Sequence, residues 1–314
     1  MSSNVGLSNV LQKYQISSGL AKRLETLSNY KIALILDDSS SMNTVDSTDK
    51  QTSRWDELSN FAKIIIEIAA VFNSNGCDVH FLNMQGVKNV RSFDQLSLYF
   101  RDRPAGSTPL SRTIQNVIRE NPAQSLGNKN LLIIIATDGE PTDDSGYSNI
   151  PEFKQTLLNR PTNVFTNIGA CTNDERSIGY LNGLDRELPR LDVVDDYASE
   201  LAEIRRIKGS NFQFTFGDYV TKSILGSISP DLDRYDETPI QIPASVPVSV
   251  PAPIAVQPQK TTITPTRVVP KPNLPKKKSL CSRLHILSPD YSSDSFHRKY
   301  DVPHLKLADL LCCV

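Results

Sequence analysis

The chain has 314 residues, of which 39% are hydrophobic, and a formal net charge of -1. This length accommodates one large domain of about 200–250 residues with additional segments, or two smaller domains. The near-neutral charge gives no overall basic surface, so no nucleic-acid partner is expected, and the low hydrophobic content predicts that part of the chain is unpacked.

Cysteine usage and the lack of export signals favour a cytoplasmic protein. The five cysteines and four histidines do not have the spacing of a zinc site, and we expect Cys77 and Cys171 to be small buried thiols. No charged-then-apolar signal sequence opens the chain, and no apolar run reaches the roughly 20 residues that a membrane helix needs. These features favour a reducing, intracellular compartment.

The first part of the chain predicts a helical extension followed by alternating strands and helices. Broken three- and four-residue apolar spacing predicts helix between residues 7 and 29, with an interruption at 17–19. The apolar run at 31–37 predicts a buried strand, and 53–73 predicts an amphipathic helix with Ser53 as its N-cap. The next expected elements are a strand at 78–83, a turn-rich piece, a short helix at 93–100 and a helix from Leu110.

The alternation continues to about residue 228. Residues 131–136 form the most apolar strand signal, which we expect to be central and buried on both faces. Phe212, Phe214 and Phe216 alternate and predict a last short strand before a closing helix at 219–228. The other expected elements are helices at 151–159, 173–181 and 197–207 and strands at 164–169 and 191–194. This alternation predicts an α/β fold, a mostly parallel sheet with helices on both faces.

The composition changes near residue 238. Twelve of the 20 prolines lie from there onward, together with ten Lys and Arg residues against four Asp and Glu residues. The remainder has 24 against 31, so the two parts carry net charges of +6 and -7. We predict a Pro-rich basic linker at 231–278 and a poorly ordered C-terminal tail at 279–314.

Oxygen-bearing side chains lie in three of the predicted loops. Asp37, Ser39 and Ser41 follow the first strand, Thr108 precedes a helix, and Asp138 follows the central strand. The carboxyl ends of parallel strands meet at one edge of a sheet, so these loops are expected to converge there. Carboxylate and hydroxyl oxygens are ligands that hard divalent cations prefer, and the pattern predicts a cation site.

The three motifs together resemble those of a von Willebrand factor A-type domain with a complete metal-ion-dependent adhesion site. They are Asp37-x-Ser39-x-Ser41, Thr108 within Gly-Ser-Thr-Pro-Leu, and Asp138 within Thr-Asp-Gly-Glu-Pro. The resemblance spans residues 30–230 and leaves the helical extension 1–29 outside it. It implies a doubly wound, Rossmann-like sheet and a bound Mg²⁺ or Mn²⁺. It also implies that the three hydroxyls touch the metal or its waters, while both carboxylates act largely through water.

The resemblance implies a function in protein binding. Neutral ligands leave the metal of this family able to accept an Asp or Glu carboxylate from a partner protein at an open position. We place Asp38, Ser107 and Glu140 at the rim of this surface. A divalent cation beside carboxylates could also activate water in a metal-assisted hydrolase. However, no nucleophile, histidine base or phosphate-binding loop accompanies the motifs, so we do not expect an enzyme.

Simpler explanations stay open for each motif. Asp37 and the serines could form a capping or turn cluster, Asp138 could belong to an ordinary turn, and Thr108 could cap the following helix. Glu140 could lie in a solvated loop. We expect His80 to be a strand histidine with ordinary polar partners.

The tail predicts a second kind of function, a scaffold tethered to a membrane. The lysines at 276–278 lie near Cys281, and the chain ends in Cys312-Cys313-Val314. Basic charge and acylated cysteines together would give peripheral membrane contact, whereas the alternative is a solubilising tail with inert thiols. The terminus does not fit the prenylation pattern, and residues 272–276 match a short SH3-type ligand.

Overall fold

The computed structural model describes residues 2–45, 52–172 and 175–235 of the chain. The chain divides into two units, Met1–Ile240 and Gln241–Val314, and the described residues belong to the first. The predicted tail and most of the predicted linker lie outside the described residues. The same holds for Cys281, Cys312, Cys313 and the segment 272–276.

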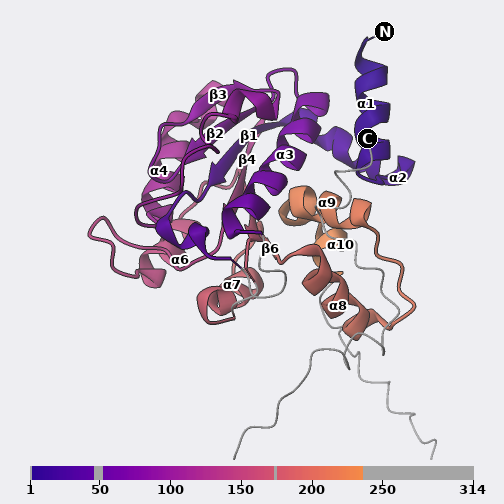
Figure 1. The fold of residues 1–314 in the computed structure, drawn as a ribbon. Coiled ribbons are helices and arrows are strands. Elements are labelled where there is room, and N and C mark those ends of the chain that lie inside the picture. The colour runs from indigo at the N-terminus through magenta and orange to yellow at the C-terminus, as the bar shows by residue number, and fades with distance from the viewer. Residues whose placement is uncertain (1, 46–51, 173–174, 236–314) are drawn as a thin grey trace, which may run out of the picture. The chain divides into compact units, whose positions relative to one another are not determined.

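A six-stranded sheet forms the centre of the first unit (Figure 1). Its order is β3-β2-β1-β4-β5-β6, with parallel neighbours throughout except that β3 runs antiparallel to β2. The predicted α/β fold with a mostly parallel sheet is confirmed. The strands are β1 (Tyr30–Leu36), β2 (Cys77–Phe81), β3 (Val87–Val90), β4 (Asn130–Thr137), β5 (Val164–Ala170) and β6 (Leu191–Val194).

The direction in which the chain adds strands reverses between β1 and β4. Leu36, at the end of β1, pairs with Phe81 of β2 on one side and with Ala136 of β4 on the other. The strands β2 and β3 then extend the sheet one way, and β5 and β6 extend it the other way. In open parallel sheets, ligands collect outside the carboxyl ends of the strands at such a reversal.

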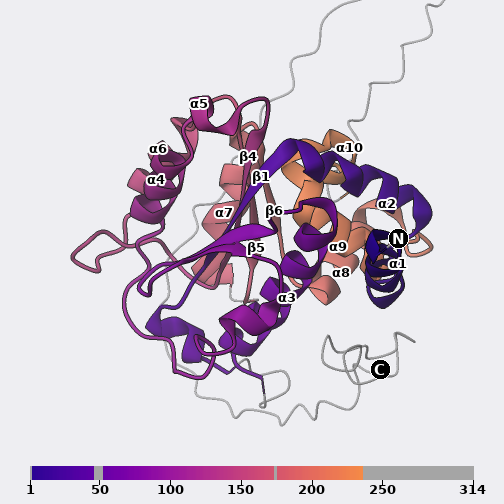
Figure 2. The ribbon, with the colours of Figure 1, turned by 90° about the horizontal axis from the view of Figure 1, so that it is seen from above.

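Helices cover both faces of the sheet. Figure 2 shows α4 and α6 on one side of the strands and α3 and α9 on the other. Residues from α4, α6 and α7 share a buried core with one face of β1 and β4, and α3 contacts these strands as well. The central strand is fully buried from Leu131 to Thr137, as predicted. The main helices are α3 (Arg54–Phe72), α4 (Leu110–Glu120), α6 (Ile150–Leu158), α7 (Glu175–Glu187), α8 (Tyr197–Lys208) and α9 (Phe216–Leu225).

Shorter elements complete the described part of the fold. The N-terminal pair is α1 (Ser2–Lys13) and α2 (Ser18–Leu24), and two further short helices are α5 (Ala123–Leu126) and α10 (Pro230–Asp233). The 3-10 turns are η1 (Glu25–Asn29), η2 (Ser40–Asn43), η3 (Phe93–Leu96) and η4 (Gly226–Ile228).

The N-terminal helical extension is packed into this fold. At the end of α1, Lys13 Nζ and the hydroxyl of the following residue, Tyr14, both donate to Glu67 Oε2 of α3, each at 2.7 Å. The helix α2 contacts α9, and Leu24 is fully buried. The predicted interruption falls where Ser17 caps α2 by accepting a hydrogen bond from the backbone of Leu20.

Two predicted elements after β2 are wrong. The piece predicted to be turn-rich contains the edge strand β3, which pairs Val87 with Val79 and Val90 with Cys77. The helix predicted at 93–100 is shortened to η3, which Ser92 and Gln95 cap. The later residues of that segment leave the helical path, and Phe100 stacks on Trp55 with ring centroids 4.6 Å apart.

The strand predicted from Phe212, Phe214 and Phe216 is also wrong. Thr215 and Asp218 form a capping box, so α9 begins at Phe216 and not at residue 219. The phenylalanines instead join an aromatic cluster, in which Tyr197 lies 6.2 Å from Phe214 and 5.5 Å from Phe216 between ring centroids.

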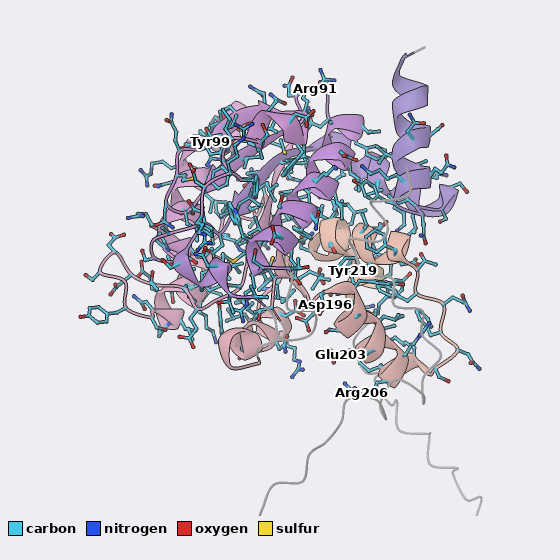
Figure 3. The ribbon with its side chains drawn as sticks, viewed as in Figure 1. Arg91, Tyr99, Asp196, Glu203, Arg206 and Tyr219 are labelled. Atoms are coloured by element: carbon cyan, nitrogen blue, oxygen red, sulfur yellow. The ribbon has the colours of Figure 1, made fainter. Side chains whose placement is uncertain are left out.

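Buried charge joins α9 to its neighbours. Lys222 is fully buried and lies 3.2 Å from Asp192 Oδ1 on β6 and 3.1 Å from Glu200 Oε1 on α8. Figure 3 shows Asp196 at the start of α8, where its carboxylate accepts a hydrogen bond from the backbone of Ala198 at 2.9 Å. The last helices are thereby fixed to the edge of the sheet.

The fold continues past the predicted boundary at residue 230. Leu232, in α10, is fully buried. Within the described ranges, none of the helices is both long and apolar enough to cross a membrane. Cys77 and Cys171 are free and buried, as predicted, and burial raises the pKa of the Cys77 thiol to about 12.

Candidate metal centre

The first loop of the candidate site begins where β1 ends. Asp37 is fully buried, and its backbone N–H donates to Ala136 O at 3.0 Å. Its Oδ1 accepts a hydrogen bond from Ser39 N at 2.9 Å, and its Oδ2 accepts one from Thr137 Oγ1 at 2.6 Å. Burial and the negative charge of Asp138 raise the pKa of Asp37 to about 7. A cation nearby would favour the charged carboxylate instead.

Serine hydroxyls join the first loop to the third. Ser39 Oγ lies 3.0 Å from Ser41 Oγ, and Ser41 Oγ donates to Asp138 Oδ1 at 2.8 Å. Ser39 and Asp138 are buried, whereas Ser41 is exposed. Ser39 holds the N-cap position of η2 but makes no side-chain cap bond. The Ser39 side chain therefore does not cap this turn, and the exposed Ser41 hydroxyl contacts a buried carboxylate.

The second loop lies against the first through hydrogen bonds. Ala105 N donates to Asp38 O at 2.8 Å, Ser40 N donates to Gly106 O at 3.1 Å, and Gly106 N donates to Ser40 Oγ at 3.1 Å. Gly106 has a φ of +112°, and a Cβ there would lie 2.5 Å from Asn83 Oδ1. Only glycine fits this position without strain.

Thr108 connects the second loop to the third. Thr108 N donates to Thr142 Oγ1 at 3.0 Å, and Thr142 N donates to Thr108 O at 2.9 Å. Thr108 is buried, and Pro109 holds the N-cap position of α4 without a side-chain cap bond. The residues predicted to converge, Asp37, Ser39, Ser41, Thr108 and Asp138, therefore lie on three loops that hydrogen bonds hold together.

Asp38 does not lie at an exposed rim, so this prediction is wrong. It is 1% exposed, and its Oδ1 accepts hydrogen bonds from Leu82 N at 2.9 Å and Asn83 N at 2.8 Å. Its Oδ2 accepts one from Met84 N at 2.9 Å. Successive side chains at the end of a strand point to opposite sides, which turns Asp38 away from Asp37 and toward the end of β2.

The other two predicted rim residues are partly exposed. Ser107 O accepts a hydrogen bond from Asn83 Nδ2 at 2.9 Å, and Glu140 accepts one from Ser148 Oγ. Glu140 therefore contacts the hairpin that the bridge between Thr142 and Ser148 closes. Tyr147, on the same hairpin, is 74% exposed.

Arg54 is a charged residue of this site that the sequence patterns do not reveal. Its Nη1 donates to Asp138 Oδ2 at 2.8 Å, and its side chain is 10% exposed. Its backbone N–H donates to Thr44 O at 2.9 Å, which brings the start of α3 back to the first loop. In the sequence, Arg54 is recognisable only as the residue that follows the N-cap Ser53. That position does not determine where its long side chain points.

The oxygen donors of the three loops fit a hard divalent cation. Mg²⁺ and Mn²⁺ prefer carboxylate and hydroxyl oxygens, and Mg²⁺ keeps several of its waters. The exposed Ser41 hydroxyl is bonded to both a buried serine and a buried carboxylate, so protein oxygens and solvent meet there. The residues that would hold the ion are Asp37, Ser39, Ser41, Thr108 and Asp138.

A second group of carboxylates lies elsewhere in the described part of the chain. Oxygens of Asp185, Asp192 and Asp233 lie within 4.8 Å of one another. Lys222 Nζ is 3.2 Å from Asp192 Oδ1, so a cation of the protein already offsets part of this negative charge.

Comparison of the chain with protein-family models gives no match, and comparison with curated proteins gives none either. The chemistry of the candidate centre therefore rests on the residues and contacts of this chain alone.

Proposed function

We propose that this chain is a metal-dependent protein-binding module of the von Willebrand factor A type. The observation that carries the proposal is the convergence of three loops at the point where the strand order reverses. There, Ser41 Oγ contacts both Ser39 Oγ and Asp138 Oδ1. The buried free thiols of Cys77 and Cys171 suit a reducing, cytoplasmic location.

The ligand class follows from the donors. The proposed cation, Mg²⁺ or Mn²⁺, would supply a positive charge beside three neutral hydroxyls, namely those of Ser39, Ser41 and Thr108. An Asp or Glu carboxylate of a partner protein matches this charge and also the preference of such ions for oxygen. Binding of that partner is then expected to require the metal.

An exposed aromatic residue supports a protein partner. Tyr147 is 74% exposed on a hairpin that Asp143 orders by accepting hydrogen bonds from Ser145 N at 2.8 Å and Tyr147 N at 3.0 Å. The bridge between Thr142 and Ser148 closes this hairpin, and the hydrogen bond from Thr108 N to Thr142 Oγ1 ties it to the second loop of the candidate centre. Tyrosine is enriched in protein interfaces, where its ring gives a large contact area.

A hydrolase is the weaker alternative. Of the four histidines in the sequence, His80 lies within the described residues, on β2, with Lys88 Nζ 3.5 Å from its Nε2. Burial raises the pKa of the Cys171 thiol well above its usual value, which leaves it a poor nucleophile. We therefore favour binding over catalysis.

Capture of proteins from a cell lysate on the immobilised full chain tests the proposed function. We expect a set of proteins that is captured in Mg²⁺ and lost in chelator, and lost also with Asp37→Asn. Tyr147→Ala should weaken this capture, whereas Leu158→Ala, which removes another exposed apolar side chain (54% exposed, on α6), should not. Identical capture in Mg²⁺, in chelator and with Asp37→Asn would contradict the proposal.

A further inference from the structure

We infer that Arg54 is a built-in counter-cation that sets the charge of the candidate metal centre. It lowers the affinity of the centre for a divalent cation, and it raises the affinity of the metal-loaded centre for an anionic ligand. This inference rests on the proposed function. It concerns a residue outside the Asp-x-Ser-x-Ser, Thr108 and Asp138 motifs.

Both oxygens of the Asp138 carboxylate are engaged before any metal binds. Oδ2 accepts a hydrogen bond from Arg54 Nη1 at 2.8 Å, and Oδ1 accepts one from Ser41 Oγ at 2.8 Å. Asp138 is fully buried, and the Arg54 side chain is 10% exposed. A charge-assisted bond between buried groups is stronger than one in water, so the guanidinium already offsets the charge of this carboxylate.

The start of α3 holds Arg54 in this position. Ser53 and Asp56 form a capping box, and Arg54 N donates to Thr44 O at 2.9 Å. The next residue, Trp55, is 6% exposed and stacks on Phe100 with ring centroids 4.6 Å apart. The backbone that carries the guanidinium is therefore fixed on both sides.

The positive charge of Arg54 affects how the candidate centre binds a divalent cation and a carboxylate. Asp37 and Asp138 carry two negative charges when both are ionised, which a divalent cation alone would neutralise. Arg54, in contact with Asp138, adds one positive charge to this sum. Like charges repel more strongly away from bulk water, so Arg54 opposes the cation. The same added positive charge increases the attraction of the loaded centre for a carboxylate.

Titration of the full-length chain with Mn²⁺, followed by electron paramagnetic resonance of the free ion, tests the inference. Arg54→Gln keeps an N–H donor for Asp138 and removes the charge, and Arg54→Met is a second variant without the charge. Arg54→Lys keeps the charge. Arg160→Gln is the matched control, because Arg160 is 5% exposed and donates to the carbonyls of Pro189 and Arg190, before β6 and away from the loops.

We expect Arg54→Gln and Arg54→Met to bind Mn²⁺ about tenfold more tightly than wild type. Arg54→Lys and Arg160→Gln should bind it as wild type does. Acetate is the anionic probe, and water-proton relaxation reports its displacement of water from bound Mn²⁺. The acetate concentration that displaces half of the water from bound Mn²⁺ should be lower for wild type than for Arg54→Gln. Circular dichroism checks that each variant is folded.

The outcomes separate this inference from the proposed function. Mn²⁺ binding by wild type that is unchanged or weaker in both charge-removing variants overturns the role of Arg54 and leaves the metal centre standing. Binding only by the charge-removing variants supports the counter-cation and overturns metal-dependent function in the native chain. No binding by any of the variants or by wild type overturns both.

Discussion

Asp37 and Asp38 are neighbours in the chain, and their carboxylates have different partners. Asp38 accepts hydrogen bonds from three consecutive backbone N–H groups, those of Leu82, Asn83 and Met84. Asp37 accepts from Ser39 N and Thr137 Oγ1 and lies at the candidate centre. At the scale of single residues, this contrast indicates that Asp38 stabilises the fold, and it leaves Asp37 as a ligand of the proposed cation.

Substituting each aspartate by asparagine separates these roles. Asp38→Asn leaves one acceptor oxygen for the N–H groups after β2, so the free energy of unfolding in chelator should fall by about 1–3 kcal/mol. Asp37→Asn removes a buried charge beside Asp138, so stability in chelator should be kept or should rise. Urea unfolding measures both effects. Mn²⁺ binding should survive Asp38→Asn and be lost in Asp37→Asn, and the reverse order would refute this division.

His80 gives the fold a predictable response to pH. Burial, followed by the positive charge of Lys88, holds the pKa of His80 below its usual value, while Glu120 and Asp78 act in the opposite direction. The unfolded chain therefore takes up this proton at a higher pH than the folded chain does. The contribution is a loss of stability as pH falls through the unfolded pKa of about 6.5.

His80→Gln removes this titration and keeps a polar side chain of similar size. Urea unfolding at about pH 7.5 and about pH 5.5 should show that wild type loses more stability than the variant over this interval. Because other groups titrate in both proteins, only the difference between them reports His80. An equal loss in both proteins would show that His80 has the same pKa folded and unfolded.

At the scale of elements, the N-terminal helices belong to the core of the first unit. In the extension, Tyr14 donates a hydrogen bond to Glu67 of α3, and α2 contacts α9. Leu24, at the end of α2, is fully buried. A Cβ on Gly217 of α9 would lie 2.2 Å from Gln15 O. The backbone of α9 therefore packs directly against the backbone of the segment between α1 and α2, which leaves no room for a side chain at this position. The extension predicted to lie outside the family resemblance thus stabilises the same domain.

Leu24→Ala tests this packing. Truncating a fully buried leucine should lower the free energy of unfolding by about 2–5 kcal/mol, because apolar contacts are lost and a cavity remains. Leu158→Ala, at a side chain that is 54% exposed, should change it by no more than about 0.5 kcal/mol. Chemical denaturation of the full-length chain gives both values. Similar small effects would mean that the extension is not part of the cooperative unit.

Periodicity and capping residues predicted most of the elements, because these features depend on neighbours in sequence. The uninterrupted apolar run at 131–136 indicated the central strand, and Ser53 as an N-cap indicated the start of α3. The edge strand β3 escaped prediction because Lys88 and Asn89 are exposed and give it no apolar pattern. The alternating phenylalanines at 212–216 were misleading because Thr215 and Asp218 start a helix there.

At the scale of the whole molecule, the candidate site also has features that the sequence predicted and features that it did not. Strand ends predicted that the loops of Asp37 and Asp138 lie at the same edge of the sheet, since the parallel neighbours β1 and β4 share one carboxyl edge. The partners of Asp38 and Arg54 were not predictable, because they depend on which way a side chain points from a loop or a helix start. Arg54 in particular reaches Asp138 across 84 residues of sequence.

The whole molecule is expected to gain stability when a divalent cation binds. A ligand that binds only the folded state stabilises it by about 2.7 kcal/mol at 100 times its dissociation constant. In a domain of this size each kcal/mol raises the melting temperature by about 2–4 °C. Replacing Asp37 should remove the effect without unfolding the domain.

Thermal melting of the full-length chain in chelator and in millimolar Mg²⁺ or Mn²⁺ tests the central claim most directly. The metal should raise the melting temperature of wild type by several degrees, about 5–10 °C near saturation. It should leave that of Asp37→Asn unchanged. No shift in wild type, or an equal shift in Asp37→Asn, would contradict a divalent-cation centre built on these three loops.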